Sequence, residues 1–283
     1  MMNTKKMIGL FAIAVCSLLN FNASAQLKVP APSPAQTVKQ SFGLGEVSVE
    51  YSRPSVKGRV IFGDVVPFGK TWRTGANAST KITFTDDVKL EGRDVKAGTY
   101  AMYSMPNKDA WDIMLYKDLS LGGNVADYKI ENEVIRLKVK PSILSNKIES
   151  FTINFSDLTP TSLAIELLWE NTRIAISVST EIDAKIMKNI ETNVINDSRP
   201  YFQAASYYFE NNKDLKQALT WASKAAEQNP KAYWMMLLKS KIEYKLNDKV
   251  AGRASAEKTI ELATADKNDD YTIMAKKLIE SNK

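Results

Sequence analysis

The sequence contains no histidine and a single cysteine, Cys16. Without histidine there is no Ser-His-Asp triad and no imidazole ligand for a metal ion. Cys16 lies in an apolar run near the amino terminus, so the rest of the chain offers neither a disulfide nor a thiolate ligand. We therefore expect this chain of 283 residues to be stabilised by its hydrophobic cores, with no metal and no cofactor.

Other catalytic patterns are also scarce. The sequence has no glycine-rich motif of the kind that cradles phosphates between a strand and a helix. Ser255 and Lys258 have the spacing of a Ser-Lys pair, but they lie on the solvated face of a predicted helix. Glu131 and Glu133 are paired carboxylates, and we interpret them as surface charge before a strand. The sequence therefore gives no strong catalytic signal.

The amino terminus has the three parts of a secretory signal peptide. Lys5 and Lys6 precede the apolar run MIGLFAIAVCSLL, and Ala23-Ser24-Ala25 forms a cleavage signal. The run is too short to span a membrane, although an uncleaved anchor is the alternative. We predict a signal peptide over residues 1–25, cleavage after Ala25 and a periplasmic or secreted protein. No later segment approaches transmembrane length, so no membrane span is expected after cleavage.

Charge sets a limit on the partners. Cleavage would remove two lysines and leave 36 basic against 32 acidic residues, a net charge of +4. This mild excess is compatible with a small anionic ligand. It is far below the basic stripe that nucleic-acid binding requires, so no nucleic-acid partner is expected.

The first part of the mature chain predicts an all-β domain. Residues 26–41 carry three prolines between small residues, which predicts an extended leader without a core of its own. From about residue 42 to 180, apolar and polar residues alternate with the period of half-buried strands. The alternating runs are EVSVEY, KITFT, IRLKV, FTINF, LAIELLW and IAISV, and TYAMYSM and WDIMLY are predicted as two further strands. One apolar face on each run predicts antiparallel strands in a two-sheet sandwich or a flattened barrel.

Two connections in this domain are predicted specifically. Residues 117–133 contain Gly122 and Gly123 and have no sustained period, so they predict a long loop, which is either functional or mobile. The polar trio Glu170, Asn171 and Thr172 predicts a tight turn that joins the last two strands.

After residue 180 the apolar period changes to that of a helix. A connecting helix is predicted over residues 181–198, and residues 199–283 predict an all-α domain. Asp214 and Gln217 are spaced as a helix-capping box. The aromatic and small residues of the first two helices resemble the tetratricopeptide repeat, at Phe202, Ala205, Ser206, Phe209, Ala218, Ala222 and Ala225. Such repeats offer a concave surface, so we expect a protein or peptide partner there.

The candidate binding residues concentrate between Tyr51 and Phe84. This segment mixes cations with glycine, proline and aromatic residues, which is typical of shaped loops. The candidates are Arg53, Lys57, Arg59, Lys70, Trp72, Arg73 and Asn77. An arginine fork suits a carboxylate or phosphate, and a tryptophan adds a stacking surface. The alternative is that these cations bond to backbone carbonyls and acids and fix the shape of the loop.

Four segments carry a resemblance to a known family: RPSVKGRVIFG, VPFGKTWRTGANASTKITF, KAGTYAMYSMP and WENTRIAISV. Together they resemble the family called domain of unknown function 2911, over about residues 40–180, and the WRTGAN block is the most specific part. The resemblance implies an exported bacterial protein with a β domain, sometimes followed by helical repeats. It implies no activity and assigns no catalytic residue.

Two functions from different classes follow from these observations. The first is an exported, non-catalytic binding or scaffolding protein. Its β domain would hold a small anionic or glycan ligand at the basic loops, and its helical repeats would bind a protein. The second is a periplasmic hydrolase of glycans or phosphoesters, with the cations stabilising the transition state. The hydrolase would need an acid or base close to Arg73, and we expect the first function.

Overall fold

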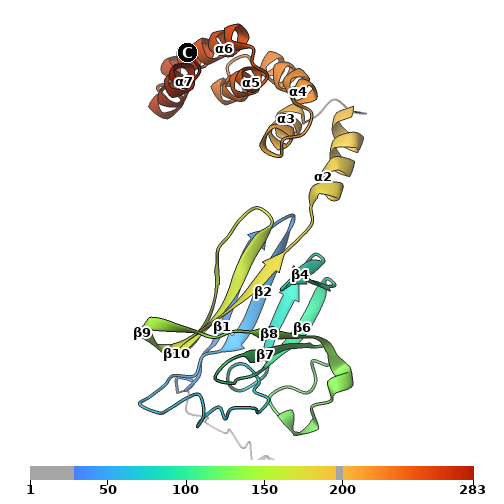
Figure 1. Cartoon of the computed structure of the whole chain (residues 1–283), viewed down its shortest axis with the longest axis vertical. Helices are drawn as coiled ribbons and strands as arrows, with labels where there is room; N and C mark the ends of the chain where they lie inside the picture. Colours follow the sequence, from blue (N-terminus) through green and yellow to red (C-terminus); the bar gives the residue numbers. More distant parts are fainter. Residues whose placement is uncertain (1–28, 196–199) are drawn as a thin grey trace, which may run out of the picture. The chain divides into compact units, whose positions relative to one another are not determined.

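A computed structural model describes residues 29–195 and 200–283 of the chain, with Ile195 as backbone only. The expected signal peptide and Cys16 lie outside the described residues. The chain divides after Thr180 into two compact units, a β unit and a helical unit that begins at Glu181 (Figure 1). The predicted order of an antiparallel β domain followed by a helical domain is confirmed.

The β unit consists of two antiparallel sheets. The six-stranded sheet has the order β1 (Ala35–Phe42), β2 (Gly45–Ser52), β3 (Thr80–Phe84), β6 (Gly98–Met105), β7 (Trp111–Tyr116) and β8 (Glu133–Val139). The four-stranded sheet has the order β5 (Arg93–Val95), β4 (Val88–Leu90), β10 (Ser162–Ser179) and β9 (Ser142–Ser156). The inward faces of both sheets contribute to one hydrophobic core, as the period-two alternation predicts.

Two predictions about the strands are wrong. Residues 35–41 were assigned to a leader without a core, but they form most of β1, which pairs with β2 along its whole length. The pattern was weak because β1 is an edge strand with only Phe42 fully buried. The turn predicted at Glu170 does not separate two strands, because β10 is continuous from residue 162 to 179. Glu170 has a φ of 50° and lies at a register shift against β9, so the polar trio marks a bulge.

The outer face of the six-stranded sheet is divided into two halves. On β2 and β3 it carries polar side chains, whereas on β6 and β7 it carries a second apolar cluster of Ala101, Tyr103, Met114 and Tyr116. The predicted loop of residues 117–133 ends one residue earlier, because Glu133 begins β8. Residues 117–132 pack over this cluster and contain two short 3-10 helices, η1 (Val125–Asp127) and η2 (Ile130–Asn132). We call this segment the covering loop.

The helical unit begins with α2 (Asp183–Ile190) and a π-helical turn, η3 (Glu191–Ile195). It continues through α3 (Tyr201–Glu210), α4 (Leu215–Gln228), α5 (Tyr233–Lys245), α6 (Lys249–Ala265) and α7 (Asp269–Ser281). The predicted end of the connecting helix, residues 196–198, lies outside the described residues. None of the described helices is both long and apolar enough to cross a membrane.

Small residues set the packing of these helices. Ala205, Ala218 and Ala222 are fully buried in the core that α3, α4 and α5 share. Between α5 and α6, a Cβ atom on Gly252 would lie 2.8 Å from the ring of Tyr244, so only glycine allows this approach. At the start of α4, Asp214 accepts hydrogen bonds from the amides of Lys216 and Gln217, which confirms the aspartate half of the predicted cap.

Candidate functional site

We call residues 51–84, which carry the candidate cations, the basic segment. Its arginines form hydrogen bonds within the protein. Arg53 donates to the carbonyl of Phe151 at 3.1 Å and to the hydroxyl of Thr152 at 2.8 Å. Arg59 donates to the carbonyls of Val56 and Ser55. These contacts tie the segment to β9 and to its own turn. They are the contacts expected if the arginines fix the shape of the loop.

Arg73 and Asn77 form a second fixed turn. Arg73 donates to the carbonyl of Asn77 at 2.9 Å, and the Asn77 amide donates to Ser33 and Ser52. Asn77 has a φ of 60°, a left-handed conformation that asparagine tolerates better than most residues. The two predicted site residues are therefore brought together, and both serve the same turn.

The lysines of the basic segment, unlike its arginines, do not bond to the described part of the protein through their side chains. Lys57 and Lys70 are exposed, and within the described ranges neither ammonium group has a hydrogen-bonding or ionic partner. The backbone amide of Lys57 donates to Glu149 at 2.8 Å. None of the pockets described below, all on the part of the chain that the structure covers, is lined by the basic candidates.

Trp72 lies in an aromatic cluster. Its ring stacks on Trp169 with centroids 5.8 Å apart and an interplanar angle of 19°, and it meets Phe151, Trp111 and Phe62 edge-on. Its indole nitrogen donates to the carbonyl of Gly75 at 3.0 Å. Trp72 therefore anchors the basic segment to both sheets, and its polar atom is already used inside the protein.

These contacts lead to a test of the basic segment. Arg53→Ala is expected to lower the free energy of unfolding by about 1–2 kcal/mol, because two hydrogen bonds to β9 are lost. Lys70→Ala is the matched control and should change it by less than about 0.5 kcal/mol, since this side chain is exposed. Urea unfolding measures both. Equal stability of the two variants would show that the Arg53 bonds do not brace the fold.

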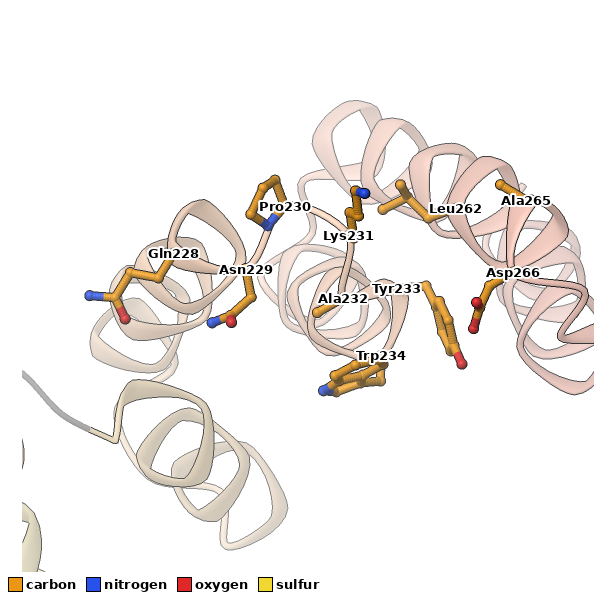
Figure 2. A pocket seen from close by; sticks show the side chains of 10 residues that line it. All are labelled: Gln228, Asn229, Pro230, Lys231, Ala232, Tyr233, Trp234, Leu262, Ala265 and Asp266. Carbon is orange, nitrogen blue, oxygen red and sulfur yellow. The ribbon is translucent and has the colours of Figure 1, made fainter.

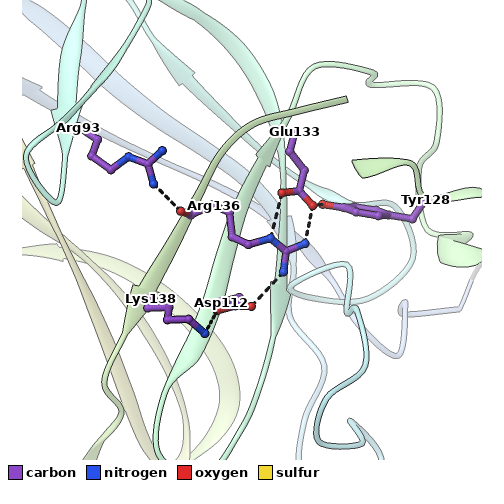
Figure 3. A network of polar contacts seen from close by, with 6 residues as sticks. All are labelled: Arg93, Asp112, Tyr128, Glu133, Arg136 and Lys138. Atoms are coloured by element: carbon purple, nitrogen blue, oxygen red, sulfur yellow. Dashed lines mark hydrogen bonds and ion pairs between the residues drawn. The ribbon is translucent and has the colours of Figure 1, made fainter. Parts of the chain in front are cut away.

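A charged network lies on the outer face of β7 and β8 (Figure 3). Arg136 forms a double hydrogen bond with Glu133 and donates to Asp112 at 2.9 Å. Lys138 donates to the other oxygen of Asp112 at 3.0 Å, and Tyr128 donates to Glu133 at 2.9 Å. The network therefore links β7, β8 and the covering loop.

The pKa shifts in this network follow from its contacts. Partial burial would raise the pKa of Asp112, but hydrogen bonds from Lys138 and Arg136 outweigh it and hold that pKa below its usual value. Burial, together with the hydrogen bond to Glu133, raises the pKa of Tyr128. Asp112 therefore stays ionised and the Tyr128 phenol stays protonated near neutral pH, as expected of a structural ion pair.

The covering loop meets the basic segment at Gly122 and Gly123. Tyr103 donates to the carbonyl of Gly122 at 2.7 Å. A Cβ atom on Gly123 would lie 2.2 Å from the Asn77 carbonyl oxygen and 2.5 Å from Arg73, so glycine is required there. The turn formed by Arg73 and Asn77 thus packs against the covering loop and supports it.

Three tyrosines at the covering loop were not among the predicted site residues. Tyr103 and Tyr116 lie under the loop, Tyr128 belongs to it, and the three rings contact one another with centroids 4.7–5.4 Å apart. The signal for Tyr103 was present, because TYAMYSM is apolar at nearly every position and this indicates a strand covered on both faces. The covering loop also encloses a pocket of about 410 Å³ beside Tyr116.

The helical unit carries two further hollows. One, of about 340 Å³, is lined by α3, α5 and α7, and we call it the helical groove. The other, of about 760 Å³, lies at the α4–α5 connection and the end of α6 (Figure 2). Trp234 belongs to both and is 40% exposed. Figure 2 shows Trp234 projecting from the start of α5, away from Pro230 and Lys231.

The fold and these sites define a class of protein: an antiparallel two-sheet β unit with a braced loop region, followed by a helical unit with an open groove. A family model described as "Protein of unknown function (DUF2911)" matches residues 33–178, more than half of the chain. The chain belongs to this family. No curated protein and no solved structure showed significant similarity to it.

Proposed function

We propose that the protein is an exported, non-catalytic binding or scaffolding protein whose helical groove holds a peptide segment of a partner protein. The observation that supports this most is that three separate helices line the groove. α3, α5 and α7 come from successive helix pairs, and each turns one face toward the same hollow. An extended peptide laid along them would contact all three.

The side chains of the groove favour a peptide with apolar or aromatic anchors. Phe202 and Phe209 come from α3, Trp234 from α5, and Tyr271 and Met274 from α7. Trp234 and Met274 are 40% and 39% exposed, and apolar side chains that are exposed together in one groove are typical of an interaction site. Aromatic residues and methionine are enriched at the centres of protein interfaces.

Further support comes from the repeat-like packing. The four alanines that match the tetratricopeptide pattern are buried in the core of the helical unit, whereas Ser206 lines the groove, and the four are Ala205, Ala218, Ala222 and Ala225. Gly252 allows a close approach of the helices in the next pair. We propose that the unit is a short tetratricopeptide-like array, and that the signal peptide takes the protein to the periplasm or outside the cell. The helical groove would then bind partner proteins in that compartment.

The contacts of Arg73 favour binding over the hydrolase alternative. The hydroxyl of Tyr103 interacts electrostatically with Arg73, but it donates its proton to Gly122, and burial raises its pKa. A phenol in that state is a poor base near neutral pH. The two exposed lysines remain the candidates for a weak anionic ligand at the basic segment.

A peptide display experiment tests the groove. Random peptides selected on the mature chain are expected to bind with an affinity that Trp234→Ala lowers by more than about tenfold, because a central aromatic anchor is lost. Val250→Ala on α6 is the matched control, since Val250 is 84% exposed and does not line the groove. Isothermal titration of the selected peptides measures the affinities. Peptides that bind Trp234→Ala as tightly as the native chain would contradict the proposal.

A further inference from the structure

The pocket under the covering loop lies outside the basic segment and outside the helical groove. It has a volume of about 410 Å³, within the range of about 300–1,000 Å³ that is common for small-molecule sites. Its polar wall is formed by Tyr116 at the end of β7 and by side chains of the covering loop, namely Asp118, Asn124, Asp127, Lys129 and Asn132. Few apolar groups face it, so an apolar ligand would gain little there.

Four of these side chains are held at one end by the protein. Asp118 accepts through Oδ1 from the amide and the hydroxyl of Ser120, and Asn124 accepts through Oδ1 from the amide of Ala126. The Tyr116 oxygen accepts from the Lys129 amide and from Nδ2 of Asn132, both at 3.1 Å. Tyr116 is only 1% exposed, so its position is fixed by packing as well.

The other end of each side chain is free. Within residues 29–195 and 200–283, no partner satisfies Oδ2 of Asp118, Nδ2 of Asn124, Oδ1 of Asn132 or the hydroxyl proton of Tyr116. The pocket wall thus presents two free acceptors and two free donors whose positions are set before any ligand arrives. Such preorganisation is what a polar recognition site requires.

The mixture of donors and acceptors selects the chemistry of the ligand. A fully deprotonated anion such as sulfate carries acceptors only and would leave Asp118 and Asn132 unpaired, and an ammonium group carries donors only and would leave Tyr116 and Asn124 unpaired. The two aspartates against one lysine also give the wall a net negative charge, which disfavours an anion. Hydroxyl groups both donate and accept, so several of them on one ligand can satisfy all four ends.

We propose that this pocket binds a neutral polyhydroxylated ligand, either a free monosaccharide or the terminal unit of a glycan. The side chains that recognise it are Tyr116, Asp118, Asn124 and Asn132. Arg73, through its turn against Gly123, is a positioning residue that holds the covering loop over the sheet.

Saturation-transfer NMR on the mature full chain tests this site. The probes are glucose, galactose, mannose and N-acetylglucosamine, with maltotriose and chitotriose for glycans, and inorganic phosphate and spermidine as charged probes. At least one sugar is expected to bind and, in 1H–15N correlation spectra of the labelled chain, to shift the backbone amides of residues 117–132. Tighter binding of a trisaccharide than of its monosaccharide would identify a glycan as the ligand source, and equal binding a free sugar.

Two variants change the atom of a side chain that has no partner and keep the Oδ1 atom that is hydrogen-bonded to the protein. Asn124→Asp keeps the cap on Ala126 but replaces the free donor by an acceptor, and Asp118→Asn does the reverse while Oδ1 still accepts from Ser120. Each is expected to weaken binding of the sugar by more than about tenfold with an unchanged melting temperature. Asp214→Asn, the same exchange at the start of α4, should leave sugar binding unchanged.

Three results would overturn the proposal. They are the absence of binding by every sugar in the set, sugar binding that both variants retain at native strength, and binding of phosphate or spermidine in place of the sugars. If one variant fails to fold, the other variant and the positions of the shifted amides decide. None of these results bears on the helical groove, because its test uses peptides and Trp234→Ala.

Discussion

Trp72→Ala is expected to lower the free energy of unfolding of the β unit by about 3 kcal/mol. The indole ring of Trp72 packs against Phe62, Trp111, Phe151 and Trp169, which come from the basic segment and from three strands of the two sheets. Trp111, Phe151 and Trp169 are fixed by their own strands, so the structure around the missing ring cannot collapse to fill the cavity.

Urea unfolding of the mature chain, followed by circular dichroism and by tryptophan fluorescence, measures this loss. Trp72→Phe is the control, because it keeps an aromatic ring in the cluster while it removes the hydrogen bond to Gly75 and the smaller part of the indole. It should cost about 1 kcal/mol. An unchanged unfolding midpoint for Trp72→Ala would show that the ring does not support the core. Trp72 would then again be a candidate ligand-binding residue.

The strands that the sequence predicts well are those with one face in the shared core. β8 is an example, since Ile135, Leu137 and Val139 are buried while Arg136 and Lys138 point outward. The helices of the helical unit are predicted equally well from the sequence, because its apolar and small residues repeat at helical spacing over long segments. In both cases the burial pattern is local and regular, so the residues themselves carry the information.

Other strands leave little trace in the sequence. β1 buries only Phe42 fully, and the first half of β9 is mostly exposed, with Ile143 at 91%. Both are held by backbone hydrogen bonds to a partner strand, and such bonds do not depend on side-chain type. Hydrophobic periodicity therefore underestimates the length of edge strands.

The candidate sites divide in a similar way. The sequence predicted that the basic segment is a set of shaped loops, and the positive φ values of Lys57, Thr74 and Asn77 agree with that. It could not show that Arg53 reaches Phe151, because that contact joins residues 98 positions apart. The pocket under the covering loop was missed for a different reason, since its polar side chains lie close together in the sequence but follow no period and converge only through Tyr116.

Arg136→Met is expected to destabilise the β unit by about 2–3 kcal/mol near pH 7. The side chains of Glu133 and Asp112 are only 9% and 13% exposed, so removing the guanidinium leaves two poorly solvated carboxylates without their main partner. The cost stays below that of a fully orphaned pair because Glu133 keeps the Tyr128 hydroxyl and Asp112 keeps Lys138. Methionine preserves most of the volume of the arginine stem.

Lys138→Met is the matched control. Lys138 contacts the same carboxylate as Arg136, but its side chain is 78% exposed, so solvent and salt screen the pair. We expect a loss of less than about 1 kcal/mol, and one that shrinks further in high salt. Equal losses in the two variants would mean that burial does not determine the strength of this network.

The pH dependence of the Arg136→Met loss gives an independent check. In the folded chain, Lys138 and Arg136 hold the pKa of Asp112 below its ordinary value of 3.8 despite partial burial. A depressed folded-state pKa contributes stability that is present above the unfolded pKa and is lost as the pH falls through the folded pKa. The native chain and Arg136→Met should therefore differ most above about pH 5, and the difference should shrink as the pH falls below 3.8, the ordinary pKa of Asp112, and through its lower folded-state pKa. Urea unfolding from about pH 7 down to about pH 2 measures this convergence, and a difference that stays constant over that whole range would show that Arg136 acts through packing and not through its charge.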